Sequence, residues 1–374
     1  MTGQVYLDFN ATAPAKPEVV DALARIMGEG GNASSVHATG REARRHVEEA
    51  RAAVAALVGA AADSVIFTAS GTESNNQALR CAGRDRVIAS TIEHESVHLA
   101  RNDAVLAPVT SAGLVDLGAL EEALAAEATP ALVSVMFANN ETGIIQPVAE
   151  IAALAHRFGA LVHCDAVQAA GKVALDMGAL GVDFMTISAH KLAGPQGVGA
   201  LMVRDRATVV RFVHGGGQER GLRAGTENVS GIAGFGMAAS LAHEALGEFA
   251  GLAVLRDDLE HRVREIAPDI TVIGAGEARL PNTAKFATPG LSSEIQVMGL
   301  DLAGIAISAG SACSAGKVEA PYVLTAMGIA DELATCAIRV SLGWSTTADH
   351  IDAFVDAWRG VCERVRGRAV SAAE

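Results

Sequence analysis

The stretch ALVHCDAVQAAGKVALDMGALGVDFMTISAHKLAGPQGVGALMV, residues 160–203, contains three short runs of mostly apolar and β-branched residues. Apolar runs of this length, separated by helical stretches, are typical of buried strands in a parallel sheet joined by crossovers. The same alternation extends upstream and therefore predicts an α/β fold with a mainly parallel sheet. The predicted strands are 64–69, 86–90, 131–137, 160–164, 184–188 and 198–203, and the predicted helices between them are 72–82 and 148–158.

The character of the sequence changes after about residue 248. A helical pattern comes first, followed by short β-rich runs and an amphipathic final helix, at 252–266, 271–273, 283–287, 337–341 and 348–366. Because 374 residues exceed what one hydrophobic core usually supports, we expect two domains. We assign residues 15–248 to a large sheet domain and residues 1–14 with 249–374 to a smaller α+β domain.

Composition and charge argue against several classes of function. The formal net charge is −14 and aromatic residues make up 4% of the chain, so we expect no nucleic-acid partner. The longest uncharged runs, such as 302–316, are too short and too rich in Gly and Ser to span a membrane. The five cysteines have no CxxC spacing, and residues 1–10 lack a signal-peptide pattern. We therefore expect a cytoplasmic protein without a disulfide framework or a metal site.

Lys191 stands where the strand predicted at 184–188 gives way to a Gly/Pro loop, which turns straight back into the next strand. A lysine at a buried strand end is costly unless it is paired or uncharged. A lysine that forms a Schiff base needs such a partly buried position and a lowered pKa. This segment alone leaves open that Lys191 is a surface residue, and the neighbouring Ser188 and His190 are equally ambiguous by themselves.

Asp165 follows the apolar run ALVHC, so we expect it at the carboxyl end of a strand, where ligands bind in open α/β sheets. A carboxylate there can keep a pyridinium nitrogen protonated, which makes pyridoxal phosphate an electron sink. Gln168, three residues further on, could reach the same ring. The alternative is that Asp165 only caps the start of the AVQAAG segment.

The segment TASGTESN, residues 68–75, joins a predicted strand to a predicted helix. Gly71 permits a tight turn, and the helix that begins near Thr72 offers free amide groups and a dipole to a phosphate. No dinucleotide or P-loop motif accompanies it. With Lys191 and Asp165 at the same edge of the sheet, this turn completes the groups that pyridoxal phosphate requires. The combination predicts a pyridoxal-phosphate enzyme.

The order of motifs along the chain resembles a known family. The motifs are GTES, EHES, NNETG, DAVQ, SAHK, HGGGQERGLRAGTEN and SAGSACS. They are similar to the NifS/IscS-type cysteine desulfurases of the class V aminotransferase group, which have pyridoxal-phosphate fold type I. The similarity runs from Tyr6 to Gly343. Two departures, GNASS at 31–35 where the family commonly has a proline and ATA at 11–13 where ATT is frequent, remove no catalytic group.

The resemblance implies roles for the residues around the cofactor. Lys191 would hold it as a Schiff base and shuttle protons, and His94 would stack on its pyridine ring as a second catalytic group. Asn140 and Gln168 would bond to the ring oxygen. The phosphate would be held by Gly71, Thr72, Ser188 and His190. Thr226 in RAGTEN would reach the phosphate of the neighbouring subunit, which implies a homodimer with shared active sites.

The resemblance also implies how the substrate, L-cysteine, is bound. Arg339 would bind its carboxylate, with Asn140 nearby, and a bidentate guanidinium suits that task better than an ammonium group. The alternation along AIRVS leaves another reading open, because Arg339 alternates with two apolar residues as a surface arginine on an edge strand would.

Cys313 lies in AISAGSACSAG, where small residues predict an exposed loop. The resemblance implies that its thiolate attacks the sulfur of L-cysteine and becomes a persulfide, which makes Cys313 the third catalytic residue. By contrast, Cys81 and Cys164 lie in apolar helix and strand patterns, where we expect packing residues.

The SAGSACS form resembles the branch of the family with a longer catalytic loop, which usually serves iron–sulfur cluster assembly or general sulfur delivery. We therefore expect release of L-alanine and transfer of the sulfur to an acceptor protein, for example an iron–sulfur scaffold, or to a small thiol. Two alternatives are open at this level. One is another class V reaction, such as selenocysteine lysis or amino transfer, and the other is a catalytically silent scaffold for sulfur carriers.

Overall fold

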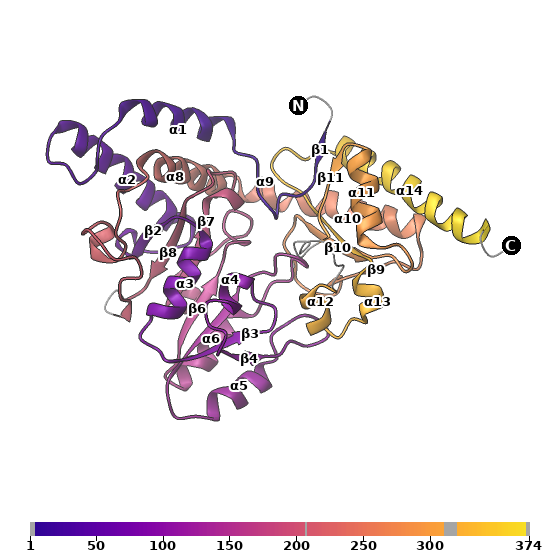
Figure 1. Cartoon of the computed structure of the whole chain (residues 1–374), viewed down its shortest axis with the longest axis horizontal. Helices are drawn as coiled ribbons and strands as arrows, with labels where there is room; N and C mark the ends of the chain where they lie inside the picture. The colour runs from indigo at the N-terminus through magenta and orange to yellow at the C-terminus, as the bar shows by residue number, and fades with distance from the viewer. Residues whose placement is uncertain (1–3, 206–207, 310–319, 372–374) are drawn as a thin grey trace.

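The computed structural model describes residues 4–205, 208–309 and 320–371, with side chains up to residue 365. Cys313 lies outside the described residues. Two lobes are visible, and the N-terminal strand and C-terminal helix both belong to the smaller one (Figure 1). The larger lobe holds the central sheet.

A seven-stranded sheet forms the centre of the larger lobe in the described part of the chain. Its strands lie in the order β2-β8-β7-β6-β5-β3-β4, and all neighbouring pairs are parallel except the two that involve β8. The predicted α/β fold with a mainly parallel sheet is therefore confirmed. The strands are β2 (Val65–Thr68), β3 (Arg86–Ser90), β4 (Val105–Ala107), β5 (Ala131–Met136), β6 (Leu161–Asp165), β7 (Phe184–Ser188) and β8 (Gly199–Val203).

Strand β8 corrects one prediction, because it runs antiparallel to both of its neighbours. Only residues 189–198 separate β7 from β8. A parallel connection needs a crossover of roughly a dozen residues or more, usually with a helix, so this loop reverses the chain instead. The short edge strand β4 was not predicted from the sequence.

Alternate residues of the strands face two different cores, as the pleat of a sheet requires. In β5, Val133 packs in a core with residues of α2, α5, α6 and α8, whereas Leu132 packs with residues of α3 on the other face. Helix α1 packs against α8. These helices are α1 (Pro17–Glu29), α2 (Ala38–Leu57), α3 (Gly71–Cys81), α5 (Leu117–Ala125), α6 (Val148–Arg157) and α8 (Val229–Glu244).

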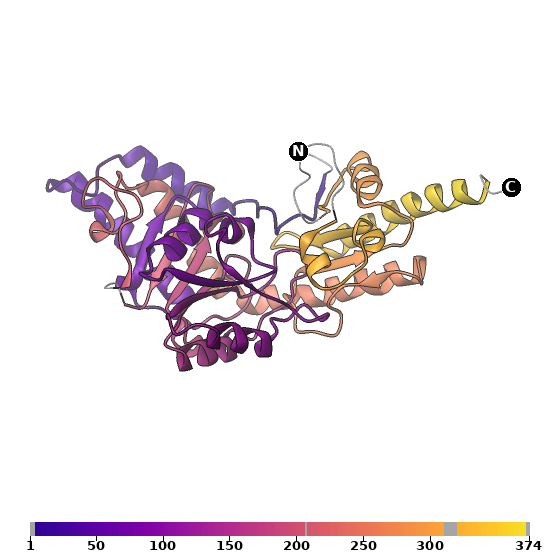
Figure 2. The ribbon, with the colours of Figure 1, turned by 60° about the horizontal axis from the view of Figure 1, so that its bottom comes forward.

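The smaller lobe has a three-stranded antiparallel sheet in the order β12-β10-β9. A parallel pair, β1 with β11, ties the N-terminal segment to this lobe. Helix α14 extends outward from the lobe in Figure 2, and it ends at residue 371 rather than at the predicted 366. These elements are β1 (Val5–Tyr6), β9 (Thr271–Val272), β10 (Thr283–Ala287), β11 (Ile305–Ala306), β12 (Ala337–Ser341), α10 (Leu252–Ile266), α11 (Ser293–Leu302) and α14 (Ala348–Ser371).

Short helices join the larger elements. They are η1 (Ala62–Ser64), α4 (Glu95–His98), α7 (Met177–Leu180), η2 (Ala189–Lys191), η4 (Glu219–Gly221), α9 (Leu246–Ala250), α12 (Tyr322–Ala326) and α13 (Asp331–Ala334). The two sheets have separate hydrophobic cores, one around β5 and β6 and one around β10, β12 and α14. On this basis we propose a domain boundary near residue 248, within α9.

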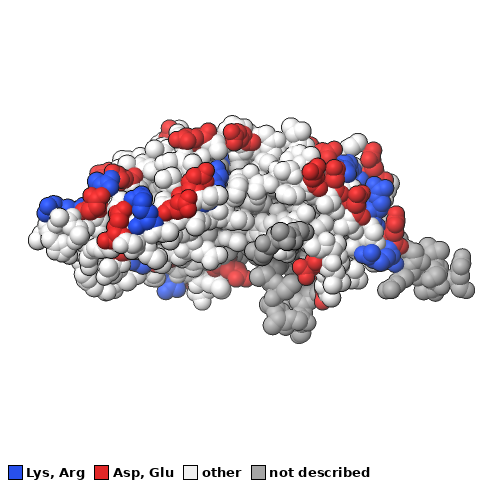
Figure 3. Space-filling view, turned by 90° about the horizontal axis from the view of Figure 1, so that it is seen from above, with Lys and Arg blue, Asp and Glu red and all other residues white. Residues whose placement is uncertain are grey.

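Charged side chains of both signs are mixed on the face shown in Figure 3, where they gather towards the two ends and leave a mostly uncharged stretch between them. Ion pairs within single helices contribute to this mixing, for example Arg25 with Glu29 in α1 and Arg45 with Glu49 in α2. None of the helices within the described ranges is sufficiently long and apolar to cross a membrane.

Candidate active site

A cavity of about 420 Å³ opens at the carboxyl ends of β5, β6 and β7, whose last residues Met136, Asp165 and Ser188 line it. The structure brings ten of the predicted site residues to its wall. They are Gly71, Thr72, His94, Asn140, Asp165, Gln168, Ser188, His190, Lys191 and Arg339. Thr226 is exposed and does not line the cavity, and Cys313 is outside the described residues.

Lys191 lies in η2, three residues beyond the end of β7 rather than at the strand end itself. Its Nζ donates hydrogen bonds to the carbonyl oxygens of Asn10 at 2.5 Å and Ala11 at 2.8 Å. Burial, together with the positive charge of Arg339, lowers the pKa of Lys191 to about 8, against an opposing effect of nearby carboxylates. The amine therefore has the partly buried, lowered-pKa setting that the sequence predicted for a Schiff-base lysine.

Asp165 is the last residue of β6 and is almost fully buried. Its Oδ2 accepts a hydrogen bond from Asn75 Nδ2 at 2.7 Å, and its Oδ1 accepts one from the backbone N–H of Val167 at 3.0 Å. The second bond is the local cap considered as an alternative. The carboxylate makes this bond and also lines the cavity, so the two readings are compatible.

The N-terminus of α3 reaches the cavity through a capping arrangement. Ser70 Oγ accepts a hydrogen bond from the N–H of Glu73 at 3.1 Å, and Glu73 Oε2 accepts one from the N–H of Ala69 at 2.9 Å. The first helical residues, Gly71 and Thr72, line the cavity, where a helix N-terminus favours an anion. A Cβ on Gly71 would lie 3.0 Å from a methyl group of Val167, so a larger residue would crowd this turn.

His94 is connected to Asp165 by a chain of hydrogen bonds. Its Nδ1 accepts a hydrogen bond from the N–H of Ser96 at 3.1 Å and caps α4. Ser96 Oγ lies 2.9 Å from the same nitrogen and accepts a hydrogen bond from Asn75 Nδ2 at 2.8 Å. Asn75 thus links the helix cap under His94 to the carboxylate. Sequence reasoning missed Asn75 and Ser96, although both lie in motifs that were singled out.

Arg339 is buried, 3% exposed, so the alternative of a surface arginine is wrong. The β12 strand carries it towards the cavity, where its guanidinium pairs with Asp8 Oδ1 at 2.7 Å and donates to the carbonyl of Asn140 at 3.0 Å. Arg339 Nε and Asn140 Oδ1 are buried without a hydrogen-bond partner in the described part of the chain. Unsatisfied polar atoms in a cavity wall are a sign of a missing polar ligand.

Asn10 organises the floor of the cavity and was missed by sequence reasoning, although it lies in YLDFNAT, residues 6–12, where the similarity to the family begins. Its carbonyl accepts hydrogen bonds from Lys191 and from Gln168 Nε2, the latter at 3.0 Å. Its side-chain Oδ1 accepts one from Lys172 Nζ at 2.8 Å, and Gln168 Oε1 accepts another from the same amine at 2.8 Å. Gln168 is therefore held in place by two neighbours.

His190 approaches the hydroxyl of Thr12, with Nδ1 and Oγ1 3.2 Å apart. Burial, reinforced by the charge of Lys191, lowers the pKa of His190 to about 4, so its imidazole is neutral at physiological pH. The four described cysteines, Cys81, Cys164, Cys336 and Cys362, are all buried, as expected for the first two.

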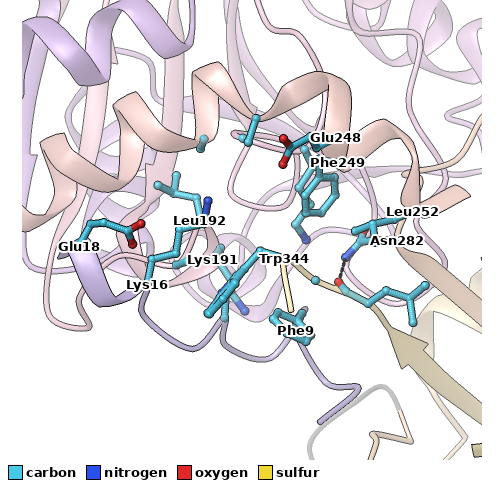
Figure 4. Close-up of a pocket in the computed structure, with 18 of the residues that line it drawn as sticks. Phe9, Lys16, Glu18, Lys191, Leu192, Glu248, Phe249, Leu252, Asn282 and Trp344 are labelled. Carbon is cyan, nitrogen blue, oxygen red and sulfur yellow. Dashed lines mark hydrogen bonds between the residues drawn. The ribbon is translucent and has the colours of Figure 1, made fainter. Parts of the chain in front are cut away.

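A second cavity of about 420 Å³ shares Lys191 with the first (Figure 4). Aromatic side chains of Phe9, Phe249 and Trp344 line it, and Trp344 Nε1 donates a hydrogen bond to the carbonyl of Pro14 at 3.0 Å. Of the predicted site residues within the described ranges, only Lys191 lines this cavity. The predicted chemistry therefore belongs to the first cavity.

Residues 5–354 match the model of the family described as Aminotransferase class-V. An "IscS-like cysteine desulfurase" of Mycobacterium tuberculosis is 41% identical over 98% of both chains, and a "Cysteine desulfurase" of Cereibacter sphaeroides is 42% identical over 99% of both. The solved structure of a NifS-like protein from Rickettsia africae has a TM-score of 0.90 at 36% identity and covers 96% of this chain and 100% of its own. The fold is therefore pyridoxal-phosphate fold type I, as predicted. The chain belongs to the class V aminotransferase family.

Proposed function

We propose that this protein is a pyridoxal-phosphate-dependent cysteine desulfurase, which converts L-cysteine to L-alanine and takes the sulfur onto Cys313 as a persulfide. The observation that carries the proposal is the convergence of Lys191, Asp165, the N-terminus of α3 and Arg339 on one cavity. Relatives about 40% identical along the whole chain are named cysteine desulfurases, which supports L-cysteine as the substrate.

The residues of the cavity fit pyridoxal phosphate. Lys191 offers an amine for its aldehyde, and Asp165 offers a buried carboxylate for its ring nitrogen. The side-chain NH₂ of Asn140 and the second Nε2–H of Gln168 can donate to the ring oxygen, and His94 is available to the face of the ring. The phosphate would be held by Gly71, Thr72, Ser188 and His190. When bound, the cofactor withdraws electrons from the α-carbon of an attached amino acid.

The chain's own residues then have separate tasks. Arg339 binds the substrate carboxylate, and its free Nε adds a donor to that site. Lys191 removes the α-proton, for which its lowered pKa suits it because a base works best near the working pH. Neutral His190 adds no positive charge beside Lys191.

The sulfur transfer is balanced without an outside oxidant. The thiolate of Cys313 attacks the sulfur of L-cysteine, so an S–S bond forms as the bond between Cβ and sulfur breaks. The electron pair of the broken bond stays on the carbon side and a proton completes the methyl group of L-alanine. Sulfur is oxidised and carbon is reduced by the same two electrons. A thiol of an acceptor, either a protein such as an iron–sulfur scaffold or a small molecule, then removes the outer sulfur.

A Cys313→Ser variant tests the proposal. After incubation with L-cysteine, we expect the wild-type protein to release alanine and to carry one added sulfur on Cys313, detected by mass spectrometry. The variant should bind L-cysteine, seen as a change in the cofactor spectrum, but should transfer no sulfur to a thiol acceptor. A Cys81→Ala variant, which removes a buried thiol, is the control and should behave as wild type. Sulfur delivery by Cys313→Ser, or keto acid formation in place of alanine, would contradict the proposal.

A further inference from the structure

Lys285 in β10 is a fully buried lysine that the mechanism above does not use. In the antiparallel register of β10 and β12 it lies directly opposite Arg339. Cross-strand partners project from the same face of a sheet, and two like charges in this position destabilise the pair. Each of the two buried cations therefore needs its own anionic partner.

The structure supplies a separate carboxylate for each cation. Asp8 pairs with Arg339, and Glu141 Oε2 lies 3.1 Å from Lys285 Nζ. Glu141 is 1% exposed, lines the cavity, and follows Asn140, whose carbonyl accepts a hydrogen bond from Arg339. Lys285 thus stands behind the part of the wall that would bind the substrate carboxylate.

The second hydrogen bond of Lys285 goes to the backbone. Its Nζ donates to the carbonyl oxygen of Ala309 at 2.8 Å. The preceding residue, Ser308, pairs with the backbone of Arg339 through two hydrogen bonds of 3.2 Å and 2.7 Å, and Ser308 also lines the cavity. Both contacts fix the segment that leads, four residues later in the sequence, to Cys313. Four residues span at most about 14 Å, so the position of Ala309 limits where Cys313 can act.

A buried ion pair is weak evidence for a stabilising role, because well-packed apolar residues often serve stability equally well. The Lys285–Glu141 pair is instead placed where it joins three parts of the site: the NNETG segment, the strand that carries Arg339, and the chain leading to Cys313. The geometry of the pair therefore suits a role in holding these three parts in fixed positions relative to one another.

We propose that Lys285 is a positioning residue for sulfur transfer, which ties the carbonyl of Ala309 to Glu141 in the cavity wall and so sets where the chain leaves the site towards Cys313. The inference rests on the proposed function and adds a residue to it. Lys285 acts through Ala309 and touches no reacting atom.

The test compares two variants of the full-length enzyme with bound cofactor. Lys285→Met alone would leave Glu141 as an unpaired buried charge, which destabilises a protein strongly. The double variant Lys285→Met/Glu141→Gln removes both charges and keeps similar volumes. Glu141→Gln alone removes the carboxylate but retains the bond from Lys285 to Ala309, because burial lowers the pKa of Lys285 and the amine can lose its proton and still donate an N–H. The ratio of the rates measured for these two variants therefore isolates the contribution of the bond from Lys285 to Ala309.

Two measurements are made on each variant. The first is hydrogen–deuterium exchange of the peptide containing Ser308 and Ala309, which needs no turnover. The second is a single-turnover experiment that separates the spectral change on binding L-cysteine from the appearance of persulfide on Cys313. We expect faster exchange in the double variant than in Glu141→Gln. We also expect persulfide formation to be slower by about 10- to 100-fold, the size of effect that a misplaced group can have, with little change in the binding step.

Equal exchange and equal persulfide rates in the two variants would overturn the inference. An equal loss in binding and in persulfide formation would also overturn it, since it would indicate a general defect of the site. If the wild-type enzyme forms no persulfide on Cys313, the proposed function fails instead, and the exchange measurement still reports whether Lys285 holds Ala309.

Discussion

At the scale of single residues, Lys191 illustrates how burial prepares a group for chemistry. Its amine is held by two backbone carbonyls, and no carboxylate within the described ranges forms an ion pair with it. Burial and the charge of Arg339 lower its pKa to about 8. The folded protein therefore holds the proton of this amine less tightly than the unfolded chain does.

This pKa shift predicts a pH-dependent stability of the cofactor-free protein. The pKa of Lys191 is about 8 in the folded state, whereas a lysine in an unfolded chain has a pKa of 10.5. Between these values the unfolded state binds more protons, so the contribution of Lys191 to stability increases as the pH rises. Lys191→Met lacks the amine that would hold the cofactor and should be inactive. Its free energy of unfolding relative to that of wild type should be highest near pH 7. Between pH 7 and pH 10.5 the free energy of unfolding of wild type should rise by about 3 kcal/mol relative to that of the variant.

Urea unfolding of the two cofactor-free proteins at several pH values measures this difference. Other titrating groups are common to both proteins and cancel in the comparison. A difference in unfolding free energy that stays constant between pH 7 and pH 10.5 would show that the amine is not perturbed.

At the scale of elements, the carboxylate of Glu219 in η4 joins three segments. It forms two hydrogen bonds with the guanidinium of Arg51 in α2, at 2.8 Å and 3.0 Å, and accepts one from the N–H of Phe67 in β2 at 3.1 Å. The guanidinium also lies 4.9 Å from the centre of the Phe67 ring. This junction covers an edge strand of the main sheet and fixes the start of the segment that leads to Thr226.

Glu219→Ala should reduce the free energy of unfolding by about 3–5 kcal/mol, because it removes the buried carboxylate that pairs with Arg51 and leaves that guanidinium only the half-exposed Glu48 as an anionic partner. Glu121→Ala is the matched control, since it breaks an exposed pair with Arg157, and it should cost less than about 1 kcal/mol. Urea unfolding monitored by circular dichroism provides both values. Similar losses in the two variants would contradict a special role of the buried junction.

At the scale of the whole molecule, Thr226 is exposed and lies outside the cavity of its own chain. Its expected role at the phosphate of a neighbouring subunit stays a prediction, as does the homodimer that this role requires. Arg223, three residues earlier, forms a two-bond ion pair with Glu73 in the first turn of α3, at 2.8 Å and 3.2 Å. This contact anchors the segment next to the helix that would bind the phosphate.

Subunit mixing tests the shared site. Lys191→Ala subunits should be inactive, and Thr226→Ala subunits should need more pyridoxal phosphate for activity. In a mixed dimer one site would carry both changes and the other neither, so that one site should regain wild-type affinity for the cofactor. Titration of the mixed dimers with pyridoxal phosphate measures this. If activity at limiting cofactor does not recover on mixing, Thr226 acts within its own subunit or has no role at the phosphate.

Much of the larger lobe could be predicted from local sequence. The strands β3 and β7 begin and end at the predicted residues, because runs such as FMTIS are apolar on both faces and are bounded by turn residues. The direction of β8 relative to its neighbours was not assigned correctly, because an apolar run does not indicate whether a strand is parallel or antiparallel. The length of the preceding loop, which is too short for a crossover, is the feature that determines it.

The sequence by itself determined that Lys191, Asp165 and the Gly71–Thr72 turn would meet, because each follows a strand and the carboxyl ends of parallel strands lie at one edge of a sheet. Only the tertiary structure decided the contributions of Asn10 and Lys285, which come from segments far from these motifs in the chain. It also decided that Arg339 is buried, because alternation along a strand separates its two faces without indicating which of them is covered. Such contacts depend on how the two lobes pack, and no local pattern records that packing.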